Sequence, residues 1–339
     1  MASSLPSRSL GSSGLEISVA GFGSWAVGGA GSSFGWGAQD DERSVAAIHH
    51  AVELGVTWVD TAAVYGVGHS EEVVGRAVRA LPADARPLVF TKCGLEWDPA
   101  APTAGERRIA TPATVRRGLE DSLRRLGMDA VDLFQIHWPD DEGNPVEEAW
   151  AEMVTLRDEG KTRAIGVSNF DPGLLERCEA IGHVDSLQPP FSLLERTTAL
   201  ELLPWAREHG TGVICYSPMG SGLLTDTFSA ERAAALPEND WRRRPPSFRE
   251  PQLSRNLALR DALRPIAERH GATTAAVAIA WVASWPGVSG AIAGARGPEQ
   301  VDGWIGGARL RLSDDDLDEI ARAIAETGAG SGPADPRLA

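Results

Sequence analysis

Apolar residues recur along the chain in eight short runs, most of them four to six residues long and rich in β-branched or aromatic side chains. Runs of this length and composition are typical of buried parallel strands. Helical patterns lie between most of them, and this alternation favours a closed barrel over a doubly wound sheet. The runs lie at residues 17–22, 56–59, 88–91, 131–136, 164–167, 184–187, 213–216 and 288–293.

Amphipathic stretches between the runs carry the signals of helix ends. One of them has Pro112 in its first turn and stops at Gly127, and both residues are favoured at those positions. Such patterns occupy residues 41–54, 70–78, 111–126 and 145–159. The expected fold class is therefore α/β, a (β/α)8 or TIM barrel in a single domain.

Three segments fall outside the alternation. Residues 1–16 contain Gly and Ser turns and are expected to form a β-hairpin that closes the bottom of the barrel, which would then span residues 17–326. The proline-rich, charged stretch 224–255 predicts a long loop after the seventh strand. Residues 327–339 predict a disordered C-terminal tail.

An uncharged stretch, residues 271–295, is long enough to span a bilayer. It is rich in alanine and is interrupted by Pro286 and Gly287. We therefore predict a buried helix over 275–284, a turn and a buried strand, with no membrane association. No apolar signal segment stands near the N-terminus, and we expect a cytoplasmic protein.

The charge balance restricts the possible partners. The 339 residues include 47 acidic and 32 basic side chains, a net charge of −15. Such a chain repels nucleic acid, so we expect no nucleic-acid partner. Cys93, Cys178 and Cys215 are too few and too scattered for a disulfide scaffold, and neither they nor the histidines have the spacing of a metal site. Whether the protein is a monomer or a homo-oligomer is left open.

Polar residues stand where the predicted strands end, and barrel enzymes place their chemistry at the carboxyl ends of their strands. Two residue types are scarce elsewhere. The chain has 30 Arg but only two Lys, Lys92 and Lys161, and only two Tyr, Tyr65 and Tyr216. Three of these four scarce residues lie at or just beyond strand ends, which suggests a chemical need for them.

Several motifs occur in the same order as in the aldo-keto reductases, and across about residues 8–325 the chain resembles that family. The similarity is greatest to the bacterial branch related to potassium-channel β subunits. The motifs are residues 60–66, Thr91-Lys92, residues 135–140, residues 160–170, residues 216–218, and Gly294-Ala295-Arg296 with Gln300.

This resemblance implies a catalytic tetrad of Asp60, Tyr65, Lys92 and His137. Tyrosine, with a pKa of about 10, is a poor acid near neutral pH. A nearby Lys92 ammonium, paired with Asp60, is expected to lower the pKa of Tyr65, which would act as general acid or base. His137 would donate a hydrogen bond to the substrate oxygen.

The resemblance also implies an extended nicotinamide cofactor, and no G-x-G-x-x-G fingerprint follows a strand. Arg296 and Gln300, after Gly294, would reach the adenosine phosphate, which favours NADP (NADPH). NAD stays possible, because Gly297 and Trp304 depart from the family pattern. The carboxamide would be held by Ser168, Asn169 and Gln188, with Tyr216 stacking on the ring. Around the ribose and pyrophosphate would lie Gly23, Ser24, Trp25, Ser217, Met219, Gly220, Ser221 and Gly222.

Aromatic residues on the loops after the strands indicate the substrate pocket. Trp36, Trp97 and Trp138 are the candidate substrate contacts, accompanied by Trp25 and Phe191. Trp36 and Trp97 are about as well explained by packing within their loops. The pocket suits a planar or apolar carbonyl compound, and a tryptophan-lined pocket also suits a sugar.

The function expected from these features is the reduction of an aldehyde or ketone to an alcohol. The alternatives are a sugar or alcohol dehydrogenase, a natural-product ketoreductase, and a regulatory subunit that binds a cofactor. The chain lacks a long N-terminal extension of the kind that would act as a blocking peptide, which favours an enzyme. The arginines at 242–244 are interpreted as a solvated loop.

Overall fold

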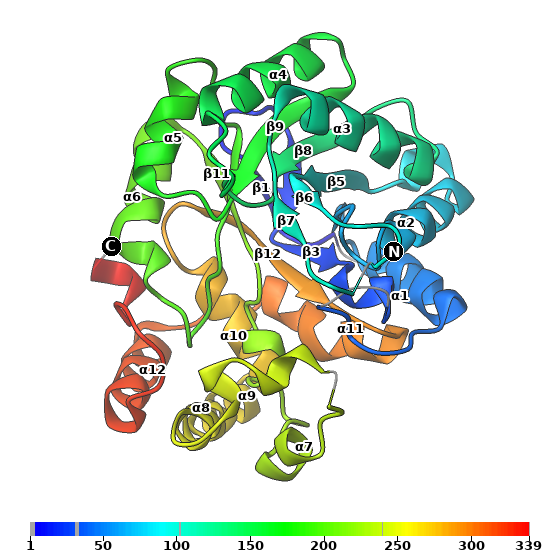
Figure 1. Ribbon diagram of the computed structural model, residues 1–339. Coiled ribbons are helices and arrows are strands. Elements are labelled where there is room, and N and C mark those ends of the chain that lie inside the picture. The colour runs from blue at the N-terminus through cyan, green and yellow to red at the C-terminus, as the bar shows by residue number, and fades with distance from the viewer. Residues whose placement is uncertain (1–3, 31–33, 102, 239, 339) are drawn as a thin grey trace.

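The computed structural model describes residues 4–30, 34–101, 103–238 and 240–338. Eight parallel strands close into a barrel, in which β12 pairs with β3. The (β/α)8 architecture expected from the sequence is thereby confirmed (Figure 1). In the order of their pairing, the strands are β3 (Ala20–Gly23), β4 (Trp58–Asp60), β5 (Leu88–Cys93), β8 (Val131–Ile136), β9 (Thr162–Ser168), β10 (Ser186–Gln188), β11 (Gly212–Cys215) and β12 (Val288–Gly294).

Helices surround the barrel (Figure 1). The signals at their ends act as predicted: the side chain of Thr111 accepts a hydrogen bond from the backbone N–H of Thr114, and Gly127 ends the same helix with a left-handed φ of 64°. The helices between or after the barrel strands are α1 (Asp41–Glu53), α2 (His69–Ala80), α3 (Pro112–Leu126), α4 (Val146–Asp158), α5 (Pro172–Glu179), α6 (Thr198–His209), α10 (Thr274–Ala283) and α11 (Pro298–Ile305).

An antiparallel hairpin of β1 (Ser7–Ser9) and β2 (Glu16–Ser18) precedes the barrel. Its apolar residues join Trp58 and Phe90 in the cluster that fills the barrel interior. The single strand expected over residues 17–22 is wrong, because the chain changes its pairing partner within that run. Ile17 pairs with Arg8 in the hairpin, whereas Ala20 already pairs with β12.

The connection from β11 to β12 is a long excursion with an apolar cluster of its own, formed by Leu223, Phe228, Phe248 and Leu253. The long loop expected after the seventh barrel strand is therefore present, but it contains short helices. Before α10 these are η3 (Gly220–Gly222), α7 (Ala230–Ala234), η4 (Trp241–Arg243), η5 (Pro246–Phe248), α8 (Gln252–Ala262) and α9 (Arg264–Arg269). The other short elements are η1 (Trp25–Gly28), η2 (Ala83–Ala85), β6 (Leu95–Glu96), β7 (Arg107–Arg108) and η6 (Gly306–Ala308).

The C-terminal segment follows α12 (Asp314–Thr327) and ends with η7 (Pro336–Leu338). The disordered tail expected here is wrong for the residues that the structure describes. The buried side chain of Arg196 donates hydrogen bonds of 3.1 Å to the carbonyl oxygens of both Ala329 and Gly332. These contacts hold the segment near α6, where Figure 1 places the end of the chain.

The uncharged stretch folds as predicted, into α10 and β12. Every residue of α10 is buried, and β12 is buried up to Gly294. Within the described part of the chain, no helix has the length and apolar character needed to cross a bilayer.

Candidate functional site

Four polar side chains meet at the carboxyl end of the barrel. Asp60 is the last residue of β4, Lys92 is the penultimate residue of β5, and His137 directly follows β8. Tyr65 lies in the turn between β4 and α2. Because β4, β5 and β8 are parallel neighbours, their ends bring these residues together, as the sequence predicted.

Asp60 and Lys92 form a buried ion pair. The Lys92 Nζ lies 2.6 Å from Asp60 Oδ1 and also donates to the carbonyl oxygen of Thr61 at 2.8 Å. The second carboxylate oxygen of Asp60 accepts a hydrogen bond of 2.9 Å from the Gln188 amide. Burial raises the pKa of Asp60 and lowers that of Lys92, and the attraction between the two charges opposes both shifts.

Tyr65 adjoins this pair. The Lys92 Nζ is 5.2 Å from the centre of the Tyr65 ring, and the His137 ring centre is 5.7 Å away at an interplanar angle of 80°. Burial raises the pKa of Tyr65 well above its usual value, and the negative charge of Asp60 adds to the rise. The expectation that Lys92 lowers the pKa of Tyr65 is therefore not met, because loss of solvent is the larger effect on the phenolate.

His137 is kept neutral. Burial lowers the pKa of its ring well below the usual value, and the positive charge of Lys92 acts in the same direction. A neutral imidazole carries one N–H donor and one acceptor nitrogen. Since the side chain is only partly buried, this ring can offer a hydrogen bond to a small molecule beside Tyr65.

The amide side chains expected to hold a carboxamide form a connected group. Asn169 Nδ2 donates to the carbonyl oxygen of His137 and to Ser168 Oγ, both at 3.0 Å, and Asn169 Oδ1 accepts from the Tyr216 hydroxyl at 2.8 Å. The Ser168 hydroxyl donates to the carbonyl oxygen of Gln188 at 2.7 Å. These contacts connect the ends of β9, β10 and β11.

Backbone strain is concentrated at the same end of the barrel. Asn169, Ser217 and Ser221 have positive φ values of 63°, 56° and 54°, in the left-handed region that residues other than glycine seldom adopt. Gly220 and Gly222, in the same turn as Ser221 and Met219, also have positive φ. Strained conformations of this kind collect at ligand-binding sites.

The loop after β3 is tied to its neighbours through Ser24. Both the backbone N–H and the hydroxyl of Ser24 donate to the carbonyl oxygen of Asp60 at 2.9 Å, and its hydroxyl lies 2.8 Å from Ser70 Oγ. Ser24 is therefore placed to anchor the loop rather than to reach a ligand. Gly23 and Trp25 flank it, and Trp25 is partly exposed.

A cavity of about 350 Å³ adjoins the two residues expected to bind an adenosine phosphate. The Arg296 guanidinium donates to Gln39 Oε1 at 2.7 Å and to the carbonyl oxygen of Ala38, and Gln300 Oε1 accepts from the Arg296 backbone N–H at 2.7 Å. Sequence reasoning missed Gln39 and Arg43, which come from the loop before α1 and from α1 itself. The cavity is lined by Ala38, Gln39, Asp40, Arg43, Arg296, Glu299 and Gln300.

Three indoles from two loops pack together above Tyr65. The Trp25 ring is stacked on Tyr65 with centres 6.2 Å apart, and Trp241 packs on Trp25 at 5.0 Å. Trp36 closes the group, 5.3 Å from Trp25 and 5.6 Å from Trp241. The indole N–H groups of Trp36 and Trp241 are buried without a hydrogen-bond partner among the described residues.

The other aromatic candidates lie elsewhere. Arg108 covers the Trp138 ring at 4.2 Å, and Trp97, which is partly exposed, has no ring contact with the three-indole group among the described residues. Phe191 is fully buried against Trp281 and is a core residue, so its expected place in the pocket is wrong. Trp304, which departs from the family pattern, is likewise buried in the core.

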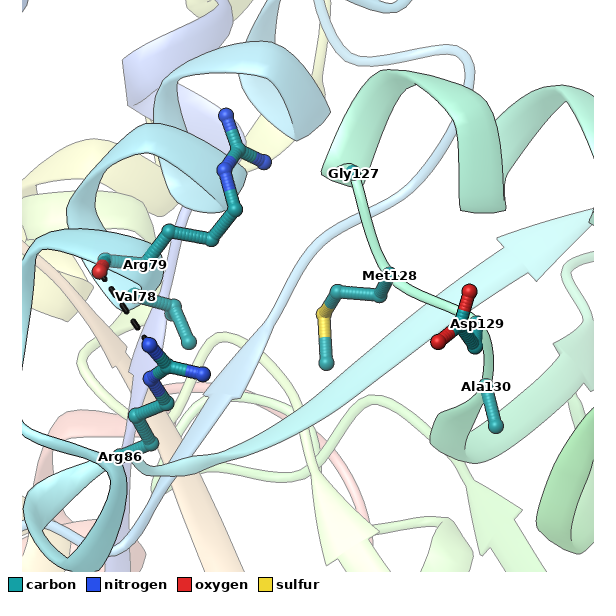
Figure 2. Close-up of a pocket in the computed structure, with 7 residues that line it drawn as sticks. All are labelled: Val78, Arg79, Arg86, Gly127, Met128, Asp129 and Ala130. Atoms are coloured by element: carbon teal, nitrogen blue, oxygen red, sulfur yellow. Dashed lines mark hydrogen bonds between the residues drawn. The ribbon is translucent and has the colours of Figure 1, made fainter.

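A second cavity, of about 500 Å³, lies away from this site. It is bounded by the end of α2, by Arg86 and by the turn that precedes β8, at the amino end of the barrel strands. Figure 2 shows Met128 projecting between Arg86 and Asp129, and the Arg86 guanidinium donates to the carbonyl oxygen of Arg79. None of the residues that line this cavity belongs to the tetrad, so the cavity lacks the polar arrangement found at the carboxyl end of the barrel. Its lining consists of Val78, Arg79, Arg86, Gly127, Met128, Asp129 and Ala130.

Known proteins resemble this chain over nearly its whole length. Residues 20–325 match the model of the family described as the Aldo/keto reductase family. The chain is 33% identical to the aldo-keto reductase YhdN of Bacillus subtilis, across 94% of this chain and 93% of that protein. It is 31% identical to the NADH-specific methylglyoxal reductase of Escherichia coli, across 93% of this chain and 98% of that protein.

Solved structures give the same result. The structure of a glycerol dehydrogenase from Gluconobacter oxydans is similar to this one with a TM-score of 0.86 and 37% sequence identity, and the match covers 99% of both chains. An aldo-keto reductase from Bacillus halodurans shares the fold, with a TM-score of 0.75 at 24% identity and coverage of 94% of this chain and 96% of that chain.

Proposed function

Because the chain belongs to the aldo/keto reductase family, we propose that it reduces a small aldehyde or ketone to an alcohol with Tyr65 as the proton donor. One observation carries the proposal. The buried Asp60–Lys92 ion pair lies beside the Tyr65 ring, and the centre of the His137 ring lies 5.7 Å from the centre of that ring. Tyr65 thus supplies a proton donor, Lys92 a fixed positive charge and His137 a hydrogen-bond donor, all close to one another.

The proton comes from the Tyr65 hydroxyl. Its raised pKa keeps it protonated at neutral pH, so the proton is available when the carbonyl oxygen gains negative charge. The Lys92 ammonium stabilises the phenolate that forms as the proton leaves. Asp60 holds that ammonium in place, and in the direction of alcohol oxidation the Tyr65 phenolate takes the proton back.

His137 orients the substrate. As a neutral imidazole it donates a hydrogen bond to the carbonyl oxygen, and this bond strengthens as negative charge develops there. Its backbone carbonyl oxygen accepts from Asn169 at 3.0 Å, which connects the turn after β8 to the end of β9. The substrate oxygen thus lies between the Tyr65 hydroxyl and the His137 ring.

A reduced nicotinamide, when bound, supplies the hydride. The connected group of Ser168, Asn169, Gln188 and Tyr216 fits a carboxamide and an aromatic ring. The turn at 217–222, in which Ser217, Gly220, Ser221 and Gly222 have positive φ, would offer backbone groups to a pyrophosphate, together with the backbone of Gly23 and Trp25. Gly294, Arg296 and Gln300 suit the adenosine end, where the cavity of about 350 Å³ lies.

NADPH is the cofactor we expect to be preferred. Arg296 and Arg43 both line the adenosine-end cavity, and a guanidinium is a good partner for a 2′-phosphate. Glu299, which forms an ion pair with Arg43 at 2.5 Å, and Asp40 counter that charge. The name of the Escherichia coli relative specifies NADH, so NADH is the alternative to be measured.

The substrate we propose is a small molecule with oxygen on neighbouring carbons. Two of the similar proteins are named for methylglyoxal and glycerol, both three-carbon compounds of this kind. The buried N–H groups of Trp36 and Trp241 are donors that such additional oxygen atoms would match. The same site run in the oxidative direction would act on a small polyol.

The test is consumption of NADPH and NADH, followed by absorbance, with methylglyoxal and glycolaldehyde, and of NADP⁺ and NAD⁺ with glycerol. Tyr65→Phe is the control, since it removes the hydroxyl and keeps the ring. We expect turnover by the wild type and a loss of about a thousandfold or more in Tyr65→Phe, in line with the loss of a general acid. Cofactor binding, measured by calorimetry, should be nearly unchanged. Equal turnover by both proteins would remove Tyr65 as the proton donor.

A further inference from the structure

Trp241 belongs to the long excursion between β11 and β12, yet its ring packs against the loop that follows β3, the first strand of the barrel. Its ring contacts Trp25 at 5.0 Å and Trp36 at 5.6 Å, both of which follow β3. Trp25 in turn is stacked on Tyr65, with ring planes 29° apart. The rings therefore form a column from Tyr65 through Trp25 to Trp241.

Trp25 contacts the rings of both Tyr65 and Trp241. Its indole N–H donates to the carbonyl oxygen of Phe34 at 3.1 Å. Removal of the Trp241 ring would leave Trp25 free to tilt away from Tyr65. The width of the space beside the Tyr65 hydroxyl thus depends on Trp241.

The segment that carries Trp241 is attached to the loop after β3 by two cation–π contacts. The Arg242 guanidinium lies 4.8 Å from the Trp36 ring centre, and that of Arg244 lies 4.9 Å from the Phe34 ring centre. The expectation that residues 242–244 are a solvated loop is therefore wrong for Arg242, whose side chain is 12% exposed.

Arg242 is itself fixed by an acidic neighbour. It forms two hydrogen bonds with the side chain of Asp240, of 2.7 Å and 3.0 Å, and the Asp240 side chain is only 8% exposed. Although burial acts in the other direction, these bonds hold the pKa of Asp240 below its usual value. The charged pair therefore holds the Arg242 guanidinium over the Trp36 ring.

The excursion has its own apolar core, and Trp241 packs against it. Phe248 contacts the Trp241 ring at 6.3 Å and belongs to the apolar cluster with Phe228 and Leu253. A segment that packs around its own core can present a side chain at a defined position, as a flexible loop cannot.

We propose that Trp241 is a specificity-determining residue that limits the size of the substrate by holding Trp25 and Trp36 over Tyr65, with Arg242 as its positioning residue. This inference rests on the proposed carbonyl reduction at Tyr65. It assigns to the β11–β12 excursion the task of fixing the outer wall of the substrate pocket. On this proposal, a small carbonyl compound is accommodated beside Tyr65 while the three indoles stay together, and a bulky aromatic aldehyde only after they separate.

The experiment compares kcat and KM for methylglyoxal and for 4-nitrobenzaldehyde in four variants. In Trp241→Ala we expect the preference for the smaller substrate, expressed as the ratio of kcat/KM values, to fall about tenfold or more. The change should come mainly from a lower KM for 4-nitrobenzaldehyde, with kcat for methylglyoxal changed less than about threefold. Trp241→Phe keeps an aromatic ring and should retain most of the ratio. Arg242→Gln should shift it in the same direction as Trp241→Ala, by about threefold.

Arg243→Gln is the matched control, because Arg243 is exposed and its guanidinium contacts the carbonyl oxygen of Leu236. It should leave the ratio unchanged. An unchanged ratio in both Trp241→Ala and Arg242→Gln would overturn the inference, as would a parallel fall of kcat for both substrates in folded variants.

A binding measurement separates this inference from the proposed function. Calorimetric titration of the wild type and of Trp241→Phe and Arg242→Gln with glycerol and with benzyl alcohol, in the presence of NADP⁺, measures pocket size without turnover. We expect Arg242→Gln to gain affinity for benzyl alcohol relative to glycerol. If the wild type reduces neither aldehyde, the proposed function fails, while an unchanged ratio of affinities in Arg242→Gln would overturn the size limit itself.

Discussion

Asp60 and Lys92 bury two opposite charges with almost no contact with solvent, at 2% and 1% exposure. Removing ions from water is costly, and a well-packed apolar pair in the same place is often as stable or more stable. The pair is therefore better explained by its chemistry than by its contribution to stability. Loss of either partner leaves an uncompensated buried charge, which costs about 3–5 kcal/mol.

The pH dependence of reduction is expected to follow from the ionisation of two side chains, Tyr65 and His137. Tyr65 must carry its proton, and because its pKa is raised, activity is retained at every pH below that pKa. His137 must be neutral, and because its pKa is lowered, activity is retained at every pH above the pKa of His137. We expect kcat/KM for methylglyoxal to be flat between about pH 6.5 and 9.5, a range set by the ordinary pKa values of the two groups. Initial rates at saturating cofactor and constant ionic strength measure this.

A fall in kcat/KM with a midpoint near pH 7 to 8 would contradict that assignment. It would mean that one of these groups titrates close to neutrality in the enzyme with cofactor bound. Tyr65→Phe serves as the reference, since the residual rate in this variant lacks the tyrosine ionisation.

Arg296 is predicted to distinguish the two nicotinamide cofactors. In Arg296→Ala we expect NADPH affinity to fall about tenfold to a hundredfold and NADH affinity to change less than about threefold, because charge-assisted hydrogen bonds to a phosphate contribute about 1.5–3 kcal/mol. Dissociation constants from fluorescence titration provide the measurement. Equal losses for the two cofactors would show that Arg296 does not recognise a 2′-phosphate.

At the scale of elements, the short strands fix the depth of the site and the loops supply its walls. The ends of the neighbouring strands β4, β5 and β8 bring Asp60, Lys92 and His137 together. The side chains above them come from the loops after β3, β4 and β11. These loops are far apart in sequence and meet because the closed barrel brings their strands around a common axis.

The amphipathic helices and buried strands were predictable because each depends on local spacing and on end signals. Residues 111–126 were expected to be helical, and α3 covers Pro112–Leu126. The run at 17–22 was not resolved into two strands, because a run of apolar residues does not show where the chain exchanges one pairing partner for another. The short helices of the excursion were missed for a similar reason, since their core is a separate small cluster.

At the scale of the molecule, the C-terminal segment stabilises the loop that precedes α6. Removal of residues 329–339 deletes the carbonyl groups of Ala329 and Gly332 that accept hydrogen bonds from the buried Arg196. We expect the free energy of unfolding to fall by about 3 kcal/mol, since hydrogen bonds from a charged donor are lost. Urea denaturation followed by circular dichroism gives this value.

The control for this truncation removes only the last two residues. The Leu338 side chain is 85% exposed, so its loss should change the unfolding free energy by less than about 0.5 kcal/mol. An equal loss of stability in the two truncated proteins would show that the contacts of Arg196 are not responsible.

The sequence by itself determined the barrel, the family and the strand-end positions of Asp60, Lys92 and His137. These follow from the alternation of apolar runs with helical patterns and from motifs that each lie within a few residues. Membership of the aldo/keto reductase family, expected from those motifs, is confirmed by the match over residues 20–325.

Only the tertiary structure decided what surrounds Tyr65 and which charges are shielded from solvent. Trp241 and Arg242 contact Trp25 and Trp36, from which they are separated by more than 200 residues of chain. No local sequence pattern encodes such a contact. The pKa of Tyr65 rises where Lys92 alone would have lowered it. The reason is that desolvation depends on every element packed around a group, whereas a sequence shows only the charges that are available.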